Sequence, residues 1–310
     1  MTTLYASDRF LAHDTGRHVE VARRIVAIRA ALTEAGLAER CELADWEMLT
    51  EEELTRLHSP EVVRRAADLA ASGGGHLDPD TVVSPDSFEV GKLAAGAACS
   101  AVDRVLTGAD DRAFCVIRPP GHHATPSRSM GFCLFNTIAL AARRALREHH
   151  LSRVLIVDFD VHHGNGTQDC FYDDGRVTFL SVHRYGFGFY PGTGAADETG
   201  TGDGLGHTLN TPLPFGISRE DYHEHFGRSL ERAAELTKPE LVLVSAGFDA
   251  HHRDPIGSLG LETEDFAEVT KRIVEVATVH AKGRIVSCLE GGYDAEALAE
   301  SATAHLRELI

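Results

Sequence analysis

The chain is short of positive charge, and this shortage is the first feature that limits what it can bind. It has 30 Lys plus Arg residues against 47 Asp plus Glu residues, which gives a formal net charge of -17. Proteins bind nucleic-acid phosphates through clustered Lys and Arg, so nucleic acid is not expected as a partner. The acidic excess favours cationic partners, but only weakly, because net charge also keeps proteins soluble.

Segments that would mark a secreted, membrane-bound or divided protein are also missing. No stretch approaches the ~18 consecutive apolar residues that a membrane helix needs. The N-terminus lacks a basic flank followed by an apolar core, so it does not resemble a signal peptide. We therefore expect no membrane partner and a cytoplasmic location. No Pro- or Ser-rich linker divides the 310 residues, which favours one domain over residues 1–310.

The cysteines contain no Cys-x-x-Cys pair, so a thiolate zinc site is not supported. They are widely scattered, and we expect them to be buried structural thiols of a reducing compartment. The six positions are Cys41, Cys99, Cys115, Cys133, Cys170 and Cys288.

What the sequence does have is a repeated alternation of strand and helix patterns. The strand candidates are short and apolar on both faces, as buried parallel strands are; they are residues 113–117, 153–157, 177–182, 241–245 and 284–289. Helices are expected near residues 20–35, 60–71, 87–106, 134–149, 219–237, 263–281 and 295–308. This order predicts an α/β fold with one parallel sheet covered by helices on both faces.

Polar clusters follow four of the predicted strands, at the point where each strand ends. They occupy residues 118–124, 158–166, 246–252 and 290–293. In open α/β sheets, ligands bind in the crevice beyond the carboxyl ends of the strands. We therefore expect the four clusters to meet on one rim and form the functional site.

One cluster has the spacing of a metal site. If the strand continues, Asp158, Asp160 and His162 project from the same face, because alternate side chains share a face. Asp and His bind zinc, and an open catalytic site needs three protein ligands plus water. A third ligand must come from another strand end, where Asp249 is best placed. Alternatively, the carboxylates cap the next helix and His162 packs, but four polar clusters at successive strand ends weigh against this.

Five motifs, in this order along the chain, together resemble the zinc-dependent histone deacetylase family. They are Arg118-Pro-Pro-Gly-His-His-Ala, Gly131-Phe-Cys, Asp158-Phe-Asp-Val-His-His-Gly-Asn-Gly-Thr, Ser245-Ala-Gly-Phe-Asp-Ala and Glu290-Gly-Gly-Tyr. Asn165 and the last motif resemble the class II branch and its bacterial amidohydrolase relatives. The resemblance extends from about Tyr5 to the C-terminal helix. It implies an arginase/deacetylase-like fold with a single, mostly parallel, eight-stranded sheet.

The resemblance implies that Asp160, His162 and Asp249 bind one Zn²⁺ per chain. Arginases share the fold and bind two metal ions, but two carboxylate positions of their motifs are Gly164 and His251 here. Fe²⁺ or Co²⁺ can substitute for zinc, since two of the three ligands are hard oxygens.

The resemblance also implies a catalytic set. It pairs His122 with Asp158 and His123 with Asn165. A carboxylate partner favours an imidazolium ion more than an amide does, so His123 is the expected general base and acid and His122 the electrostatic helper. Tyr293 is the expected donor to the developing oxyanion, and the glycines before it suit a close backbone approach.

In the resembled family, an acyl-lysine chain reaches the metal between aromatic walls. Gly131 and Phe132 match one wall, and Tyr190 stands where the other wall is usually phenylalanine. Ile256 falls where acylpolyamine-specific relatives can place an acidic residue. An apolar side chain cannot pair with a second ammonium group, so polyamine selectivity is less expected by this route.

The resemblance makes two further predictions, concerning a second cation and an inner channel. The expected K⁺ ligands are Asp158, Asp160, His162, Ser181 and the carbonyl of Val182. Arg24 occupies the position of the family's inner-channel arginine, although the stretch before it lacks the usual prolines.

The remaining histidine pairs and a glycine-rich stretch are expected to be incidental. His149 and His150 are read as helix-end residues, whereas His251 and His252 are ambiguous: they are either incidental or, because they follow a candidate ligand, residues of the rim. Residues 191–206 are rich in glycine, but they follow no strand cleanly and precede no helix, so a loop is expected rather than a phosphate cradle.

The expected function is hydrolytic deacylation of N-acetyl-lysine, in a peptide or protein, or of a similar small acylated amine. An acylpolyamine or other small-molecule amidohydrolase is the alternative enzyme. A catalytically idle acyl-lysine binding module is the alternative of another class; it would not need His122, His123 or Tyr293. No heptad pattern indicates an oligomeric interface.

Overall fold

The structure is a computed structural model that describes residues 1–310. Eight strands form one sheet in the order β2-β1-β5-β10-β9-β6-β7-β8, and every neighbouring pair is parallel. The predicted parallel α/β sheet is therefore confirmed. In chain order the strands are β1 Thr2–Tyr5, β2 Glu42–Leu43, β5 Arg112–Cys115, β6 Val154–Asp158, β7 Val177–Arg184, β8 Thr208–Leu213, β9 Leu241–Ala246 and β10 Ile285–Leu289.

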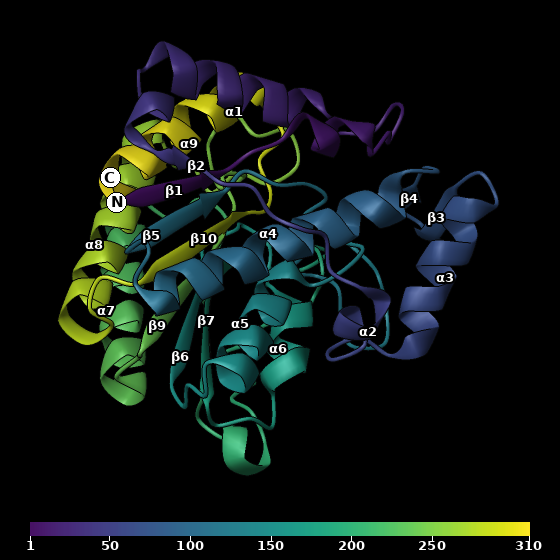
Figure 1. The fold of residues 1–310 in the computed structure, drawn as a ribbon. Coiled ribbons are helices and arrows are strands. Elements are labelled where there is room, and N and C mark those ends of the chain that lie inside the picture. The colour runs from purple at the N-terminus through teal and green to yellow at the C-terminus, as the bar shows by residue number, and fades with distance from the viewer.

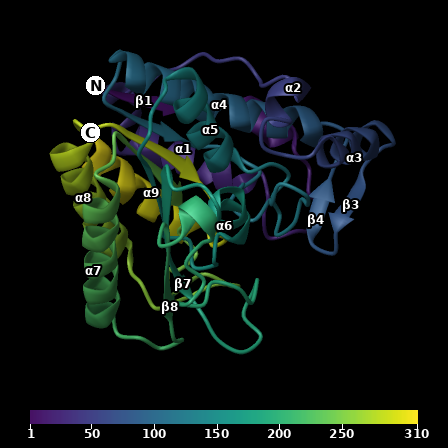
Figure 2. The ribbon, with the colours of Figure 1, turned by 90° about the horizontal axis from the view of Figure 1, so that it is seen from below.

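Helices cover both faces of this sheet (Figures 1 and 2). They are α1 Arg23–Glu34, α2 Glu51–Leu54, α3 Pro60–Ala71, α4 Ser87–Thr107, α5 Thr137–Glu148, α6 Asn165–Phe171, α7 Arg219–Thr237, α8 Thr263–His280 and α9 Ala295–Leu309. Three short 3-10 turns complete the list: η1 Asp8–Ala12, η2 Ala38–Arg40 and η3 Gly202–Gly204. At the start of α2, Thr50 and Glu53 form a capping box, and at the start of α3, Ser59 is the N-cap before Pro60.

Two apolar cores lie on opposite faces of the sheet. Leu155 and Val157 of β6 belong to the core shared with α1, α7, α8 and α9, whereas Val154 and Ile156 belong to the core shared with α4 and α5. Successive side chains of a strand point to opposite faces, so an uninterrupted apolar run supplies both cores. This arrangement fixes the direction in which the strand ends present their polar residues.

A small subdomain stands to one side of the sheet, at the right of Figures 1 and 2. It consists of α2, α3 and an antiparallel hairpin of β3 Gly75–Asp78 and β4 Thr81–Val83, packed around a third apolar core. The sequence patterns predicted α3 but not the hairpin. They also missed β1, β2, β8 and α6.

Other features agree with the sequence-based expectations. All six cysteines are free and five are buried. Residues 191–206 lie in the loop between β7 and β8, and η3 is their only helical turn. No helix combines the length and apolarity needed to span a membrane.

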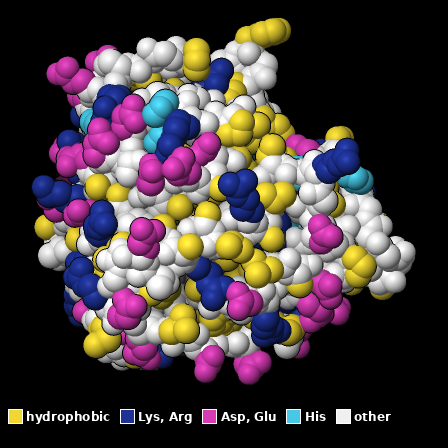
Figure 3. All heavy atoms as spheres, turned by 90° about the horizontal axis from the view of Figure 1, so that it is seen from above, with side chains coloured by type: hydrophobic (Ala, Val, Ile, Leu, Met, Phe, Trp, Pro, Cys, Tyr) yellow, Lys and Arg dark blue, Asp and Glu magenta, His cyan; other side chains and the backbone are white.

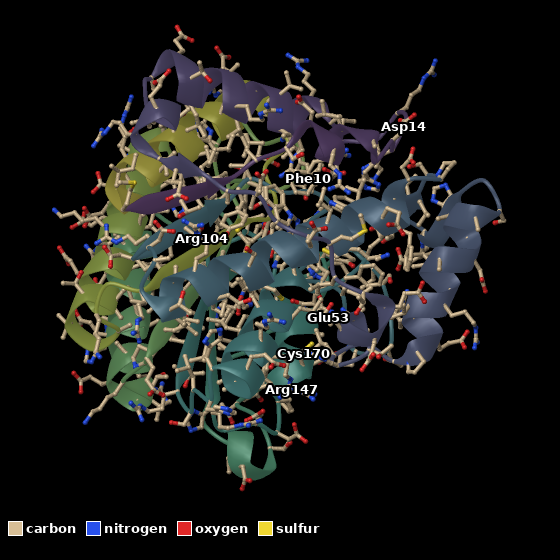
Figure 4. The ribbon with its side chains drawn as sticks, in the orientation of Figure 1. Phe10, Asp14, Glu53, Arg104, Arg147 and Cys170 are labelled. Atoms are coloured by element: carbon tan, nitrogen blue, oxygen red, sulfur yellow. The ribbon has the colours of Figure 1, made fainter.

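The acidic excess is not gathered on the face shown in Figure 3, where acidic and basic side chains are interspersed. Before α1, the chain alternates between interior and surface: Phe10 is buried, whereas Asp14 is exposed and points outward (Figure 4). Arg104 forms ion pairs with Glu42 and Asp110, which tie α4 to neighbouring segments.

Candidate active site

The four polar clusters do meet, because their strands are neighbours. β5, β10, β9 and β6 are consecutive in the sheet and parallel, so their carboxyl ends lie along one edge. The order in the sheet differs from the order in the sequence, and it brings residues 118–124 and 290–293 next to residues 246–252 and 158–166.

Two carboxylates and one imidazole converge at the centre of this edge. Candidate ligand atoms of Asp160, His162 and Asp249 all lie within 4.8 Å of one another. His162 Nδ1 is 3.1 Å from Asp160 Oδ1 and 3.1 Å from Asp249 Oδ2. All three residues are buried, and buried charges need a partner or a metal ion. This donor set fits a zinc-like ion with an open coordination position.

Glycines let the backbone close around the carboxylates. A Cβ atom on Gly291 would collide with the carboxylate oxygens of both Asp160 and Asp249, and one on Gly247 would collide with Asp160. Gly291 N also donates a hydrogen bond to Asp160 Oδ2 at 2.8 Å. There is therefore no room for a side chain at positions 247 and 291.

The two predicted histidine pairs are present. His122 Nδ1 lies 2.9 Å from Asp158 Oδ2, and His123 Nδ1 lies 2.8 Å from Asn165 Oδ1. The loop that carries both histidines is held by Glu290. Its Oε2 atom accepts hydrogen bonds from the backbone N–H groups of Gly121 (2.6 Å) and His122 (3.2 Å).

The surroundings separate the pKa values of the two histidines. Burial alone would lower the pKa of His122, but the charges of Asp158, Asp160 and Glu290 outweigh burial and raise it well above its ordinary value. Burial, together with the charges of His122 and His162, lowers the pKa of His123 well below its ordinary value. These surroundings therefore favour the cationic form of His122 and the neutral form of His123.

A cavity of about 280 Å³ opens onto this centre. Its walls include every residue predicted to contact the substrate, together with His123, His162 and Tyr293. The lining residues are Asp80, His123, Gly131, Phe132, His162, Gly188, Phe189, Tyr190, Ile256 and Tyr293.

Aromatic rings shape the cavity. Phe189 lies flat against His162, with ring centroids 5.0 Å apart and planes 3° apart. Tyr190 stands edge-on to His123 at 5.0 Å, and its hydroxyl is buried without a hydrogen-bond partner. Phe132 stands edge-on to Tyr293 at 5.7 Å. Phe189 and Tyr190 thus both line the cavity, whereas the family resemblance predicted only Tyr190 for this wall.

Tyr293 is fixed by contacts to its backbone and its ring, and its hydroxyl group stays protonated. Its backbone N–H donates to Asp254 Oδ2 at 2.7 Å, and the Arg24 guanidinium lies 5.0 Å from its ring centroid. Burial raises the pKa of Tyr293 well above its ordinary value, so the hydroxyl remains a donor. Arg24 is itself buried and donates to Gly292 O at 2.6 Å, which places the predicted inner-channel arginine directly beside Tyr293.

Comparison with known proteins identifies the family. A sequence model of the histone deacetylase domain matches residues 18–309. The chain belongs to the histone deacetylase family.

Relatives within this family agree with that assignment. Histone deacetylase 10, chloroplastic, from Oryza sativa subsp. japonica is 38% identical over 99% of this chain and 73% of the relative. The histone deacetylase-like amidohydrolase from Pseudomonas aeruginosa is 38% identical over 89% of this chain and 72% of the relative. Human polyamine deacetylase HDAC10 is 40% identical over 97% of this chain and 46% of its own length.

A solved structure matches the fold closely. The crystal structure of the HDA15 HD domain superposes with a TM-score of 0.92 at 35% identity, covering 99% of this chain and 87% of that one. The chain therefore has the arginase/deacetylase fold, and as a histone deacetylase family member it is a hydrolase that acts on amide bonds.

Two of the residues predicted to bind potassium are neighbours in the sheet. Ser181 of β7 is the register partner of Asp158 of β6, and Ser181 and Val182 are buried. The Ser181 hydroxyl is already hydrogen-bonded to His183 Nδ1 at 2.8 Å. Potassium binding by this histone deacetylase family member therefore stays a prediction.

The other histidine pairs lie outside the cavity. His149 Nε2 pairs with Asp103 at 2.7 Å. His251 and His252 stack on each other with ring centroids 4.7 Å apart, and His252 pairs with Glu262 at 3.1 Å. Neither member of the second pair lines the cavity, which agrees with the incidental reading rather than the rim reading.

Sequence reasoning missed three residues of the cavity, Asp80, Gly188 and Phe189. Asp80 comes from the β3–β4 hairpin, which follows no strand of the main sheet, so no strand-end pattern pointed to it. Phe189 is adjacent to Tyr190, and the aromatic pair itself was the available signal.

Proposed function

We propose that this chain is a metal-dependent deacylase that hydrolyses N-acetyl-lysine side chains, or similar N-acyl alkylamines, and releases acetate. We also propose that residues 1–310 act as one catalytic domain. One observation carries the proposal: a single cavity is lined by His123, Tyr293 and the candidate ligand His162. A base, an oxyanion donor and a metal site would therefore face an amide bound in this cavity.

Asp160, His162 and Asp249 would hold the metal, which we propose to be one Zn²⁺ per chain, with Fe²⁺ or Co²⁺ as substitutes. When bound, the ion would polarise the amide carbonyl and lower the pKa of water to about 7. Gly164 and His251 supply no carboxylate for a second catalytic ion.

His123 is the proton carrier in this proposal. Its Nδ1–H donates to Asn165 Oδ1, which leaves Nε2 free to accept a proton from the attacking water. The same nitrogen then delivers that proton to the amine nitrogen as the C–N bond breaks, so the products are acetic acid and the amine, which become acetate and an ammonium ion once the acid gives its proton to the amine. The low pKa of His123 keeps it neutral and ready to act as a base.

His122 and Tyr293 stabilise charge. His122, cationic beside Asp158, provides a positive field next to His123, with the two rings 4.0 Å apart. The Tyr293 hydroxyl donates to the oxygen that becomes negative during water attack. An idle binding module would need none of these groups.

The cavity suits a linear substrate with an apolar stem. Gly131, Phe132, Phe189 and Tyr190 enclose such a stem, and Ile256 adds an apolar contact at the wall. We also propose that a structural K⁺ binds next to Asp158, Asp160, His162, Ser181 and Val182, because Ser181 and Asp158 are neighbours in the sheet.

One observation favours a second candidate, an acylpolyamine substrate. Asp80 lines the cavity, and burial together with Asp78 raises its pKa only to about 6, so it is largely ionised at pH 7. A carboxylate there can pair with the second ammonium group of a polyamine. A relative that is 40% identical is named a polyamine deacetylase.

A substrate panel tests these proposals. Zinc-loaded protein is assayed with a neutral N-acetyl-lysine amide and with acetylspermidine, and the Asp80→Asn variant is assayed beside it. Lysine deacylation predicts a higher kcat/KM for the lysine amide and a similar small effect of Asp80→Asn on both substrates. A preference for acetylspermidine that Asp80→Asn removes would establish the polyamine candidate, and hydrolysis of neither would contradict the deacylase.

A further inference from the structure

Arg184, the last residue of β7, joins three segments around the cavity. Its guanidinium carbon lies 4.2 Å from the ring centroid of Phe189 and 4.3 Å from that of Phe215. Its NH1 group donates a hydrogen bond of 2.9 Å to Gly257 O. One side chain thus contacts the β7–β8 loop, the segment after β8 and the loop after β9.

Two of these contacts lead to walls of the cavity. Phe189 lies flat against His162, and Gly257 directly follows Ile256, which also lines the cavity. The Arg184 backbone N–H donates to Val161 O at 2.8 Å, so the base of the side chain is fixed next to His162. Arg184 itself does not line the cavity. Any effect on the substrate must therefore pass through Phe189 and the Ile256 loop.

Arginine is suited to this position for physical reasons. Its planar guanidinium group can lie against aromatic rings and donate to a carbonyl at the same time. Lysine would keep the charge near the rings, but it has no planar group to fill the space between two of them. Methionine would keep the length of the side chain and lose both the charge and the donor.

We propose that Arg184 is a positioning residue that sets the width of the cavity by holding Phe189 against His162 and drawing in the Ile256 loop. The expected effect on substrate binding rests on the proposed deacylase function. The expected effect on the mobility of the two loops is independent of that function.

The test compares Arg184→Met with Arg153→Met. Arg153 is a matched control because its Nε donates to the Lys238 carbonyl at 2.9 Å, at the amino end of the sheet and away from the cavity. We expect Arg184→Met to raise KM for an N-acetyl-lysine amide roughly fivefold, the size of one cation–aromatic contact, with little change in kcat. Arg184→Lys should give a smaller rise, and Arg153→Met none.

A measurement without substrate accompanies the kinetics. Hydrogen exchange of backbone amides in residues 185–190 and 254–258 should be faster in Arg184→Met than in wild type or Arg153→Met. Phe215→Leu, which removes an exposed ring from the stack, should change exchange in residues 185–190 in the same direction and serves if Arg184→Met does not fold.

The outcomes separate the two proposals. Unchanged KM and unchanged loop exchange in Arg184→Met would overturn the positioning role. A fall in kcat at constant KM would also overturn it, because the substitution would then act on catalysis and not on substrate binding. Faster exchange throughout the chain would do the same, because the effect would then not be confined to the two loops. If wild-type protein hydrolyses no acyl amide, the deacylase function fails, and the loop exchange alone still decides the role of Arg184.

Discussion

At the residue scale, the candidate site depends on two glycines as much as on its polar side chains. Asp160 and Asp249 approach the backbone of the loops after β9 and β10 so closely that only glycine fits at positions 247 and 291. This explains, in terms of space, why the Ala-Gly-Phe-Asp and Glu-Gly-Gly-Tyr motifs contain their glycines.

Gly291→Ala should therefore weaken metal binding while the rest of the fold survives. The added methyl group must displace the carboxylates of Asp160 and Asp249, and small shifts of ligands reduce metal affinity about 10- to 100-fold. Zinc affinity is measured by competition with a chelator. Gly227→Ala is the control, because its methyl group meets only the flexible end of Arg272. Equal zinc affinity in the two variants would contradict this account of the glycine.

Tyr293→Phe should lower kcat roughly 100- to 1,000-fold, the usual cost of removing one oxyanion donor. Zinc content should not change, because the Tyr293 hydroxyl has no hydrogen bond to the candidate ligands. Steady-state kinetics and elemental analysis of the same preparation check both points. Tyr185→Phe, outside the cavity, is the matched control. Near-normal turnover by Tyr293→Phe would remove this residue from the mechanism.

At the element scale, a buried ionic network connects the segment before α1 to the loops after β5 and β10. Glu20 pairs with Arg118 at 2.7 Å and with Arg24 at 3.1 Å. Arg24 then donates to Gly292 O, beside Tyr293. Burial would raise the pKa of Glu20, but the charges and hydrogen bonds of Arg118 and Arg24 outweigh burial and lower it from 4.5 to about 2.

Glu20→Gln should lower the free energy of unfolding at pH 7 by about 3–5 kcal/mol, because two buried arginines lose their carboxylate. The folded-state pKa of Glu20 lies below its unfolded value, so its contribution is complete above about pH 4.5 and is lost as pH falls toward 2. The difference between wild type and variant, measured by urea unfolding, should shrink over that range. Glu39→Gln, at an exposed residue, is the control. A difference that stays constant below pH 4.5 would contradict the assignment.

The elements that the sequence predicted well are those with long apolar patterns. β6, β9 and β10 and the helices α3, α7 and α8 fall within about one residue of their predicted bounds, since buried runs and amphipathic stretches are strong signals. β8 contains Asn210 and Pro212, α6 opens with Asn165-Gly166, and β1 has only four residues, so none carries a clear pattern. Propensity is weak for such segments, and tertiary contacts decide them.

At the scale of the whole molecule, the candidate site is assembled by sheet order. Residues near positions 122, 160, 249 and 293 are far apart in sequence, and the β5-β10-β9-β6 order places them at one edge. Strand-end clusters and the family resemblance together predicted this assembly. They could not predict the contributions of the β3–β4 hairpin or of Phe189, because the distance of a loop from the centre depends on packing rather than on a local motif.

The central claim is that one metal ion, held by Asp160, His162 and Asp249, supports deacylation in this cavity. The most direct measurement is a zinc titration of metal-free protein, with hydrolysis of an N-acetyl-lysine amide as the readout. The account predicts no activity without metal, activity that rises to a plateau at about one zinc per chain, and no recovery in Asp249→Asn at the same zinc level. Full activity in metal-free protein, or a plateau reached only at two ions per chain, would contradict it.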